Sequence, residues 1–145
     1  MRAVVQKVKN AAVSVDGLEI NRIDEGFLVL LAVKVGDQPE QAKKMADKLA
    51  KLRIIEDGDG KLNLSLLDKQ QPLLLVSQFT LYGDCSQGNR PSFVHSARPE
   101  AALLLFELVA ESLRAQGVQT LLGSFGAYMQ ISLVNDGPTT VIVEV

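Results

Sequence analysis

The fold rests on the stretch Phe27-Leu28-Val29-Leu30-Leu31-Ala32-Val33, a run of apolar residues that follows a Glu25-Gly26 turn. A strand with one face in water alternates apolar and polar residues, and this run does not alternate. Both of its faces must therefore be buried. We predict that it is a central strand of the sheet.

Short strands are predicted on the N-terminal side of this run. The ranges 4–8 and 12–15 are rich in β-branched residues, Asp16-Gly17 is a strong turn signal, and 18–23 resumes the strand pattern. The first third of the chain is therefore predicted to be a meander.

A helix and a second buried strand are predicted on the C-terminal side. Pro39 suits the first turn of a helix, which is predicted over 39–52 because apolar residues recur at helical spacing: Ala42, Met45, Ala46, Leu49 and Leu52. The sequence Asp-Gly-Asp-Gly at 57–60 resembles the start of a calcium loop, but Lys61 occupies the next ligand position, so we interpret it as a turn. The run 73–81 is then predicted to be a second buried strand.

The last third is predicted to hold one more helix and two strands. Pro99 begins the helix and Gly117 ends it, with an apolar face made of Ala102, Phe106, Val109, Ala110 and Leu113. Residues 127–134 and 139–145 have strand patterns, and the turn residues between them suit a hairpin. The predicted fold class is α+β, one domain over 1–145 with a mainly antiparallel sheet and two principal helices.

Composition limits the class of protein. The chain has 145 residues, 47% of them hydrophobic, which suffices for one compact domain. No apolar run approaches the roughly 20 residues that span a bilayer, and the first residues lack a signal-peptide core, so we expect a soluble, cytoplasmic protein without a membrane partner. The single cysteine, Cys85, and the single histidine, His95, provide neither a disulfide nor a zinc cluster. No metal or cofactor is expected, and neither residue is assigned a role.

The charge of the chain limits its partners. A net charge of -2 and a pI near 5.4 argue against tight, sequence-independent binding of nucleic acid, DNA included, because such binding depends on many phosphate contacts. Contact with RNA must be local. One basic cluster stands out in the range 43–53, made of Lys43, Lys44, Lys48, Lys51 and Arg53. We interpret it as a solvated helix face, with a patch for RNA as the alternative.

Polar side chains enter the second buried strand near its end. Within 76–81 the apolar run acquires Ser77, Gln78 and Thr80 just before a glycine-containing turn. Polar groups at a buried strand end need partners, which neighbouring backbone or a ligand can supply. Loop 88–93 then adds Arg90, in a kind of segment where binding groups are often placed.

Three motifs in this order resemble those of the D-aminoacyl-tRNA deacylase family. They are Ser77-Gln78-Phe79-Thr80-Leu81, Gly88-Asn89-Arg90-Pro91-Ser92-Phe93 and Asn135-Asp136-Gly137-Pro138. The ranges 1–8, 61–64 and 129–133 also match in register, so the resemblance spans the chain.

The resemblance implies a barrel-like sheet and a homodimer with active sites at the interface. In such a dimer the Gly137-Pro138 segment of one subunit, with a cis peptide bond, enters the active site of the other. The partner is the 3′ end of aminoacyl-tRNA, and the reaction is hydrolysis of the ester that joins a D-amino acid to tRNA. Backbone placed where an L side chain would project rejects L-residues sterically. Glycyl-tRNA, which has no side chain, is therefore expected to be cleaved as well.

Two mechanisms of hydrolysis remain open. In the first, Thr80 is the nucleophile, although no adjacent base is evident. In the second, which the family implies, the 2′-hydroxyl of the terminal ribose assists and the Phe79 amide binds the oxyanion. Ser77 and Gln78 then shape the pocket, and Thr80 supports them.

Further residues are assigned supporting roles, namely Lys7, Arg90, Met129 and Asn135. Met129 is a candidate contact for the terminal adenine, with a position in the core as the alternative. The family commonly has arginine where this chain has Lys7. Lysine keeps the charge but lacks the planar fork, so the bracing role of that arginine does not carry over directly.

Two rival functions are consistent with parts of the sequence. A general acyl or peptide hydrolase would use Thr80, Ser77 or Cys85 as nucleophile, but a base is missing. A non-catalytic module that binds RNA ends would use the basic range 43–53, but the acidic pI and the lack of aromatic-rich strands argue against it.

Overall fold

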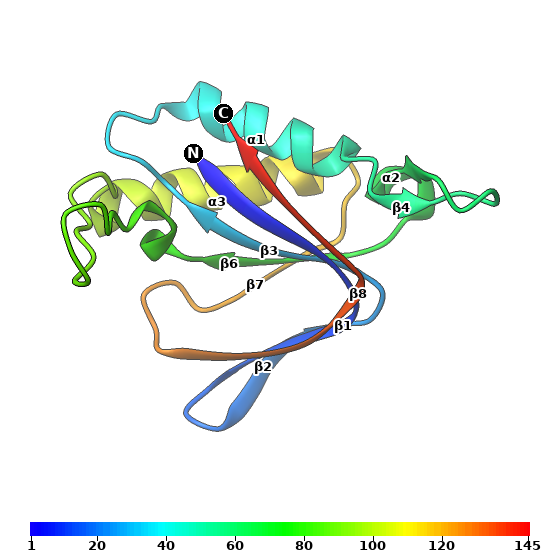
Figure 1. Ribbon diagram of the computed structural model, residues 1–145. Helices are drawn as coiled ribbons and strands as arrows, with labels where there is room; N and C mark the ends of the chain where they lie inside the picture. The colour runs from blue at the N-terminus through cyan, green and yellow to red at the C-terminus, as the bar shows by residue number, and fades with distance from the viewer.

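The computed structural model describes residues 1–145 and consists of one curled sheet with helices on one side (Figure 1). The strands of the main sheet are β1 (Arg2–Val15), β2 (Leu18–Ile23), β3 (Gly26–Ala32), β6 (Leu73–Ser77), β7 (Thr120–Leu122) and β8 (Met129–Glu144). A separate hairpin is formed by β4 (Ile55–Glu56) and β5 (Leu62–Leu64). The helices are α1 (Pro39–Lys51), α2 (Leu66–Lys69), α3 (Pro99–Ala115) and the short 3-10 helix η1 (Phe79–Tyr82).

Strand β1 pairs with three other strands of the sheet. Its first half pairs antiparallel with β3 on one side and β8 on the other, and its second half pairs with β2 and β8. The two short runs predicted at 4–8 and 12–15 are thus one continuous strand. The sequence between them did not indicate this, because Lys9 and Asn10 have low strand propensity and the ladder with β8 compensates for it.

Beyond β3 the sheet becomes parallel. Strands β3, β6 and β7 run in the same direction, so the sheet is antiparallel around β1 and parallel at its far side. Helix α1 lies in the connection between β3 and β6, and α3 in that between β6 and β7, as parallel strands require. The two principal helices were predicted correctly. The four-residue α2 was not predicted, and it begins at the side chain of Ser65, which accepts a hydrogen bond from the amide of Asp68.

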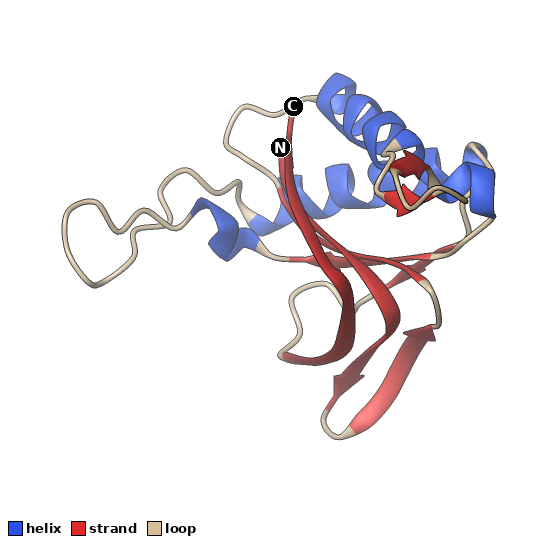
Figure 2. Cartoon of the chain, turned by 45° about the vertical axis from the view of Figure 1, so that its right-hand side comes forward, coloured by secondary structure: helices blue, strands red, loops and turns tan.

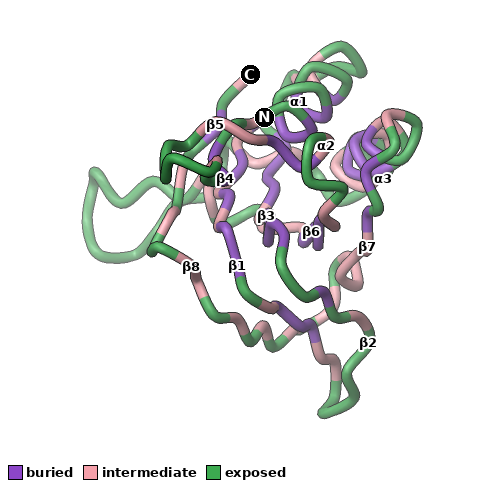
Figure 3. The backbone as a smooth tube through the Cα atoms, turned by 90° about the vertical axis from the view of Figure 1, so that its right-hand side faces the viewer, coloured by how far each residue is buried: buried purple, intermediate pink, exposed green.

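The predicted central strand is buried on both faces. Phe27, Val29 and Leu31 of β3 point into the larger core, between the sheet and helices α1 and α3. Leu28 points the opposite way, into a smaller core inside the curl of the sheet. Figure 3 shows this buried band in β1, β3 and the inner helix faces, while β8 alternates between exposed and half-buried residues.

The sheet curls toward a barrel without closing fully (Figure 2). Strand β2 approaches β7, and the side-chain amide of Asn21 donates to the carbonyl oxygen of Leu122 at 2.7 Å. The curl covers the second face of β3 and β6, which explains why these strands are apolar throughout. None of the helices combines the length and the apolar character that crossing a membrane requires.

Two predicted elements were wrong in ways that matter for the site. The strand predicted over 73–81 ends at Ser77 and is followed by η1, because Gln78 leaves the extended conformation. The hairpin predicted at 135–138 is not a hairpin. Residues on both sides of it pair with β1, so the turn residues form an irregularity within the single strand β8.

Candidate active site

The first part of the site is formed where β6 gives way to η1. Ser77 is the last residue of β6 and pairs with Leu31, and the amide of Gln78 donates to the carbonyl oxygen of Leu31 at 2.8 Å. The backbone then turns, and the side-chain amide of Gln78 donates to Oγ1 of Thr80. Ser77 and Gln78 are half-buried, whereas Phe79 and Thr80 are exposed. The motif therefore presents its polar groups at the surface end of a buried strand.

Aromatic packing fixes the conformation of η1. The rings of Phe79 and Phe93 meet edge to face with their centroids 5.1 Å apart. Oγ of Ser96 donates to the carbonyl oxygen of Phe79 at 2.9 Å. A Cβ on Gly83 would lie 2.9 Å from the Phe93 ring, so only glycine permits this close approach. Loop 88–93 thus supports the first motif through Phe93.

Backbone donors are available at the start of η1. The first amides of a 3-10 helix have no carbonyl group within the helix to bind. Phe79 and Thr80 occupy these positions, and neither amide donates to a turn or loop carbonyl group. They can therefore donate to an anionic oxygen placed beside them.

The second part of the site is the irregular segment of β8. The Gly137-Pro138 peptide bond is cis, Gly137 has a φ of 120°, and both residues are exposed. The side-chain amide of Asn135 donates to the carbonyl oxygens of Lys7 at 2.9 Å and Thr139 at 3.0 Å. These hydrogen bonds span the break in the ladder between β1 and β8.

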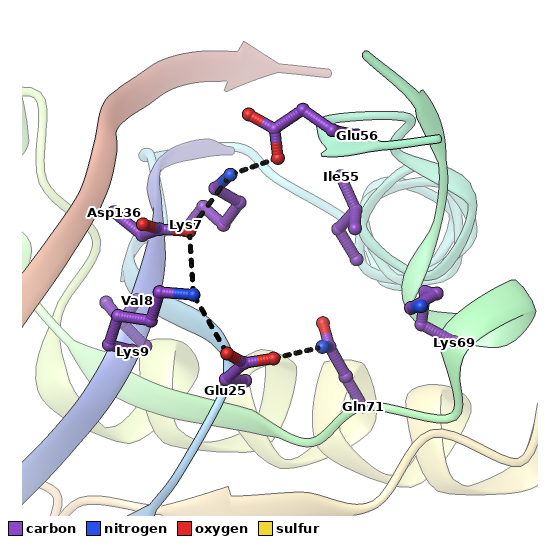
Figure 4. A pocket seen from close by; sticks show the side chains of 9 residues that line it. All are labelled: Lys7, Val8, Lys9, Glu25, Ile55, Glu56, Lys69, Gln71 and Asp136. Atoms are coloured by element: carbon purple, nitrogen blue, oxygen red, sulfur yellow. Dashed lines mark hydrogen bonds and ion pairs between the residues drawn. The ribbon is translucent and has the colours of Figure 1, made fainter. Parts of the chain in front are cut away.

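A network of charged side chains includes Asp136 of this segment (Figure 4). The buried ammonium group of Lys7 contacts Oε2 of Glu56 and lies 3.1 Å from Oδ2 of Asp136. Lys9 lies 3.7 Å from the same Asp136 oxygen and 2.9 Å from Oε1 of Glu25. These side chains line a polar cavity of about 190 Å³. Lysine at position 7 therefore contacts this segment through Asp136.

The network shifts the pKa values of Lys7, Glu56 and Asp136. Burial lowers the pKa of Lys7, but hydrogen bonds to Glu56 and Asp136 outweigh it and leave that pKa above its ordinary value. The hydrogen bond from Lys7 lowers the pKa of Asp136 and of Glu56. All three groups are therefore charged at neutral pH.

The predicted site residues fall into two groups within one chain. Lys7 and Asn135 contact each other beside Gly137-Pro138. The residues Ser77, Gln78, Phe79 and Thr80 form the other group. Met129 lies near that group, because Gly123 fits between its sulfur atom and Val76. Its half-buried side chain packs on the smaller core, in line with the alternative assigned to it.

The two groups are far apart. Ser77 pairs with Leu31, and Leu31 with Ala3, whereas the irregular segment lies beside Lys7. The groups are thus separated by four residues along the strands and by three strand spacings across the sheet. With about 3.4 Å per residue and about 4.8 Å per strand, this is roughly 20 Å along the sheet. Measured along the sheet, the two groups of a single chain therefore lie well apart.

Arg90 lies in the exposed loop between η1 and α3, so its supporting role stays a prediction. The structure contains no group of three histidine, cysteine, aspartate or glutamate residues that could hold a metal ion.

Sequence reasoning missed Glu56, Lys9 and Glu25. One signal was present, since a lysine at a buried position in a strand requires a carboxylate partner. The sequence has 17 acidic residues, and nothing in it selects Glu56 among them.

Comparison with known proteins gives a consistent result. A family model described as D-Tyr-tRNA(Tyr) deacylase matches residues 4–144. A D-aminoacyl-tRNA deacylase of Geobacillus sp. (strain WCH70) is 50% identical over 144 residues, covering 99% of this chain and 95% of that protein. Another, of Fervidobacterium nodosum (strain ATCC 35602 / DSM 5306 / Rt17-B1), is 51% identical over 99% of this chain and 97% of its own length.

Solved structures share the fold. A c-Myc DNA Unwinding Element Binding Protein superimposes with a TM-score of 0.94 at 39% identity, over 100% of this chain and 99% of that one. A probable eukaryotic D-amino acid tRNA deacylase superimposes with a TM-score of 0.85 over 99% and 98% of the two chains, and at 17% identity it supports the fold alone. With the family model and the relatives matching nearly the whole length, the chain belongs to the D-Tyr-tRNA(Tyr) deacylase family.

Proposed function

We propose that this protein hydrolyses the ester bond of D-aminoacyl-tRNA in the cytoplasm and releases free tRNA and the D-amino acid. The observation that carries the proposal is the family match over residues 4–144, together with the exposure of both motifs. No cofactor is required, because an aminoacyl ester is already activated toward water. The net charge of -2 gives no support to DNA as a second partner.

The active unit is a homodimer in this proposal. The separation of roughly 20 Å along the sheet between the two motifs of one chain supports it, because a second chain could bring the two motifs together. In the dimer, the partner subunit's Gly137 and the partner subunit's Pro138 lie beside the amide of Phe79. An isolated subunit would then lack half of the site and would be inactive.

Hydrolysis proceeds in the proposal without a protein nucleophile. Water adds to the ester carbonyl group with help from the 2′-hydroxyl of the terminal ribose, and the amide of Phe79 stabilises the oxyanion. The ester bond then breaks, and the ribose oxygen takes up a proton. Thr80 already accepts a hydrogen bond from Gln78, which suits a positioning role rather than attack on the carbonyl group.

Selection against L-residues is steric. The backbone of the partner subunit's Gly137 occupies the volume where an L side chain would project, so the D side chain itself need not be recognised. Such a site accepts many D-amino acids. It also accepts glycine, which has no side chain to exclude, so we expect glycyl-tRNA to be cleaved at enzyme concentrations that clear D-aminoacyl-tRNA.

The test is deacylation of D-tyrosyl-tRNA and of L-tyrosyl-tRNA by the purified protein without added metal. Selective release of D-tyrosine supports the proposal. Release of neither amino acid would refute it and favour a module that binds RNA ends. The mass of the protein in solution tests the homodimer separately.

A further inference from the structure

We propose that Glu56 is a positioning residue that sets the selectivity of this enzyme for D- over L-aminoacyl groups. It acts through Lys7 and Asp136 on the backbone of Gly137 and Pro138. This inference rests on the function proposed above. It adds a residue outside the three motifs, on a hairpin separate from the main sheet.

The contacts form a short path from the β4–β5 hairpin to Gly137 and Pro138. The ammonium group of Lys7 contacts Glu56 on one side and lies 3.1 Å from Asp136 on the other. Asp136 directly precedes Gly137, so a displacement of the Asp136 backbone is transmitted to the adjacent peptide unit. The Lys7 side chain is only 8% exposed, whereas that of Glu56 is 42% exposed.

Glu56 is held in place by its own hairpin. The next residue, Asp57, accepts hydrogen bonds from the amides of Asp59 at 2.9 Å and Lys61 at 3.0 Å, and from the side chain of Asn63 at 3.0 Å. The preceding residue, Ile55, is buried in the larger core. The turn at 57–60 therefore fixes the direction in which Glu56 points.

The buried position of Lys7 makes this contact important. An exposed ion pair contributes little, but a buried ammonium group that loses one of two partners must move or remain poorly paired. A lysine head group is a point charge without a fixed orientation, so its position depends on both carboxylates. Without Glu56 it shifts toward Asp136 or toward water, and the segment at 136–138 loses its exact placement.

The remaining charges cannot replace Glu56. Lys9 lies 3.7 Å from Asp136 and is bound to Glu25, which in turn accepts a hydrogen bond from Gln71. This second pair holds Asp136 from the other side but does not contact Lys7. It therefore keeps the segment folded while leaving the Lys7 head group free to move.

The experiment compares Glu56→Gln with the matched variant Glu19→Gln. Glu19 also pairs with a cation, Arg22, and its side chain is 43% exposed, but it lies on β2 away from the segment. For each protein, kcat and KM are measured separately with D-tyrosyl-tRNA, L-tyrosyl-tRNA and glycyl-tRNA. We expect Glu56→Gln to lower the ratio of D to L kcat/KM about tenfold, with glycyl-tRNA cleavage nearly unchanged. Glu19→Gln should behave as the wild type.

A double variant separates positioning from a loss of folding. The guanidinium group of arginine can pair with Asp136 through two hydrogen bonds, so Lys7→Arg combined with Glu56→Gln should restore much of the D to L ratio. An unchanged ratio in Glu56→Gln, or a lowered ratio that the arginine does not restore, would overturn the inference. A wild-type protein that fails to release D-tyrosine would instead refute the proposed function, so the two failures are distinguishable.

Discussion

The side-chain amide of Asn135 donates to the carbonyl oxygen of Lys7 at 2.9 Å and so joins β8 to β1 where their backbone ladder is interrupted. We predict that Asn135→Ala lowers the free energy of unfolding by about 1–3 kcal/mol, because it leaves the carbonyl groups of Lys7 and Thr139 without this donor. Urea unfolding measures the change. Asn89→Ala, in an exposed loop, is the control and should have no effect. Equal stabilities of the two variants would contradict the prediction.

Replacement of Thr80 by valine tests its role in the reaction. The change removes the acceptor of the Gln78 hydrogen bond but keeps the volume of the side chain. If Thr80 only positions its neighbours, kcat for D-tyrosyl-tRNA should fall by about tenfold or less, whereas loss of a nucleophile typically costs roughly a thousandfold or more. Single-turnover kinetics with Thr80→Val and Thr80→Ser distinguish these cases. Complete loss of turnover with intact tRNA binding would favour the nucleophile.

Acid should loosen the irregular segment 135–138 of β8. The hydrogen bond from Lys7 lowers the pKa of Asp136 and of Glu56, so both carboxylates stabilise the fold above their unfolded pKa values of about 4. This stabilisation is lost as the pH falls below about 4, through the lowered folded values. We predict that the melting temperature of the wild type falls more between pH 6 and pH 3 than that of Asp136→Asn. Parallel curves would argue against it.

The larger core should be sensitive to loss of volume. Leu75 is fully buried between the sheet and the helices, and Leu75→Ala should lower the free energy of unfolding by about 2–5 kcal/mol. Leu104→Ala provides the matched control, because Leu104 is 68% exposed on α3. Chemical denaturation of both variants tests the prediction, which fails if the two lose similar stability.

The elements that the sequence predicted best are those whose pattern reflects local burial. The apolar run 27–33 indicated a strand buried on both faces, and the two cores on either side of β3 confirm this. The helical repeat after Pro39 gave α1 to within one residue. Such patterns predict structure well because whether a position is apolar depends on whether that position is buried.

The elements that the sequence missed depend on distant partners. Asn-Asp-Gly-Pro at 135–138 has the composition of a hairpin turn, but β1 is long enough to pair with residues on both sides of it. Likewise, the apolar composition of 79–82 suited a strand, although the structure there is a 3-10 helix packed on Phe93. Glu56, one of the two carboxylate partners of Lys7, lies 49 residues away in the sequence, a relationship that composition cannot reveal.

The pairing of β1 with β8 also bears on how the chain folds during synthesis. Arg2 pairs with Glu144, so one edge of β1 lacks its partner until β8, at residues 129–144, has been made. Contacts between residues so far apart in sequence slow folding, because a large loop must close before they form. The nascent chain therefore leaves the ribosome with an unpaired strand edge. The irregular segment 135–138, which lies within β8, cannot pair with β1 before then.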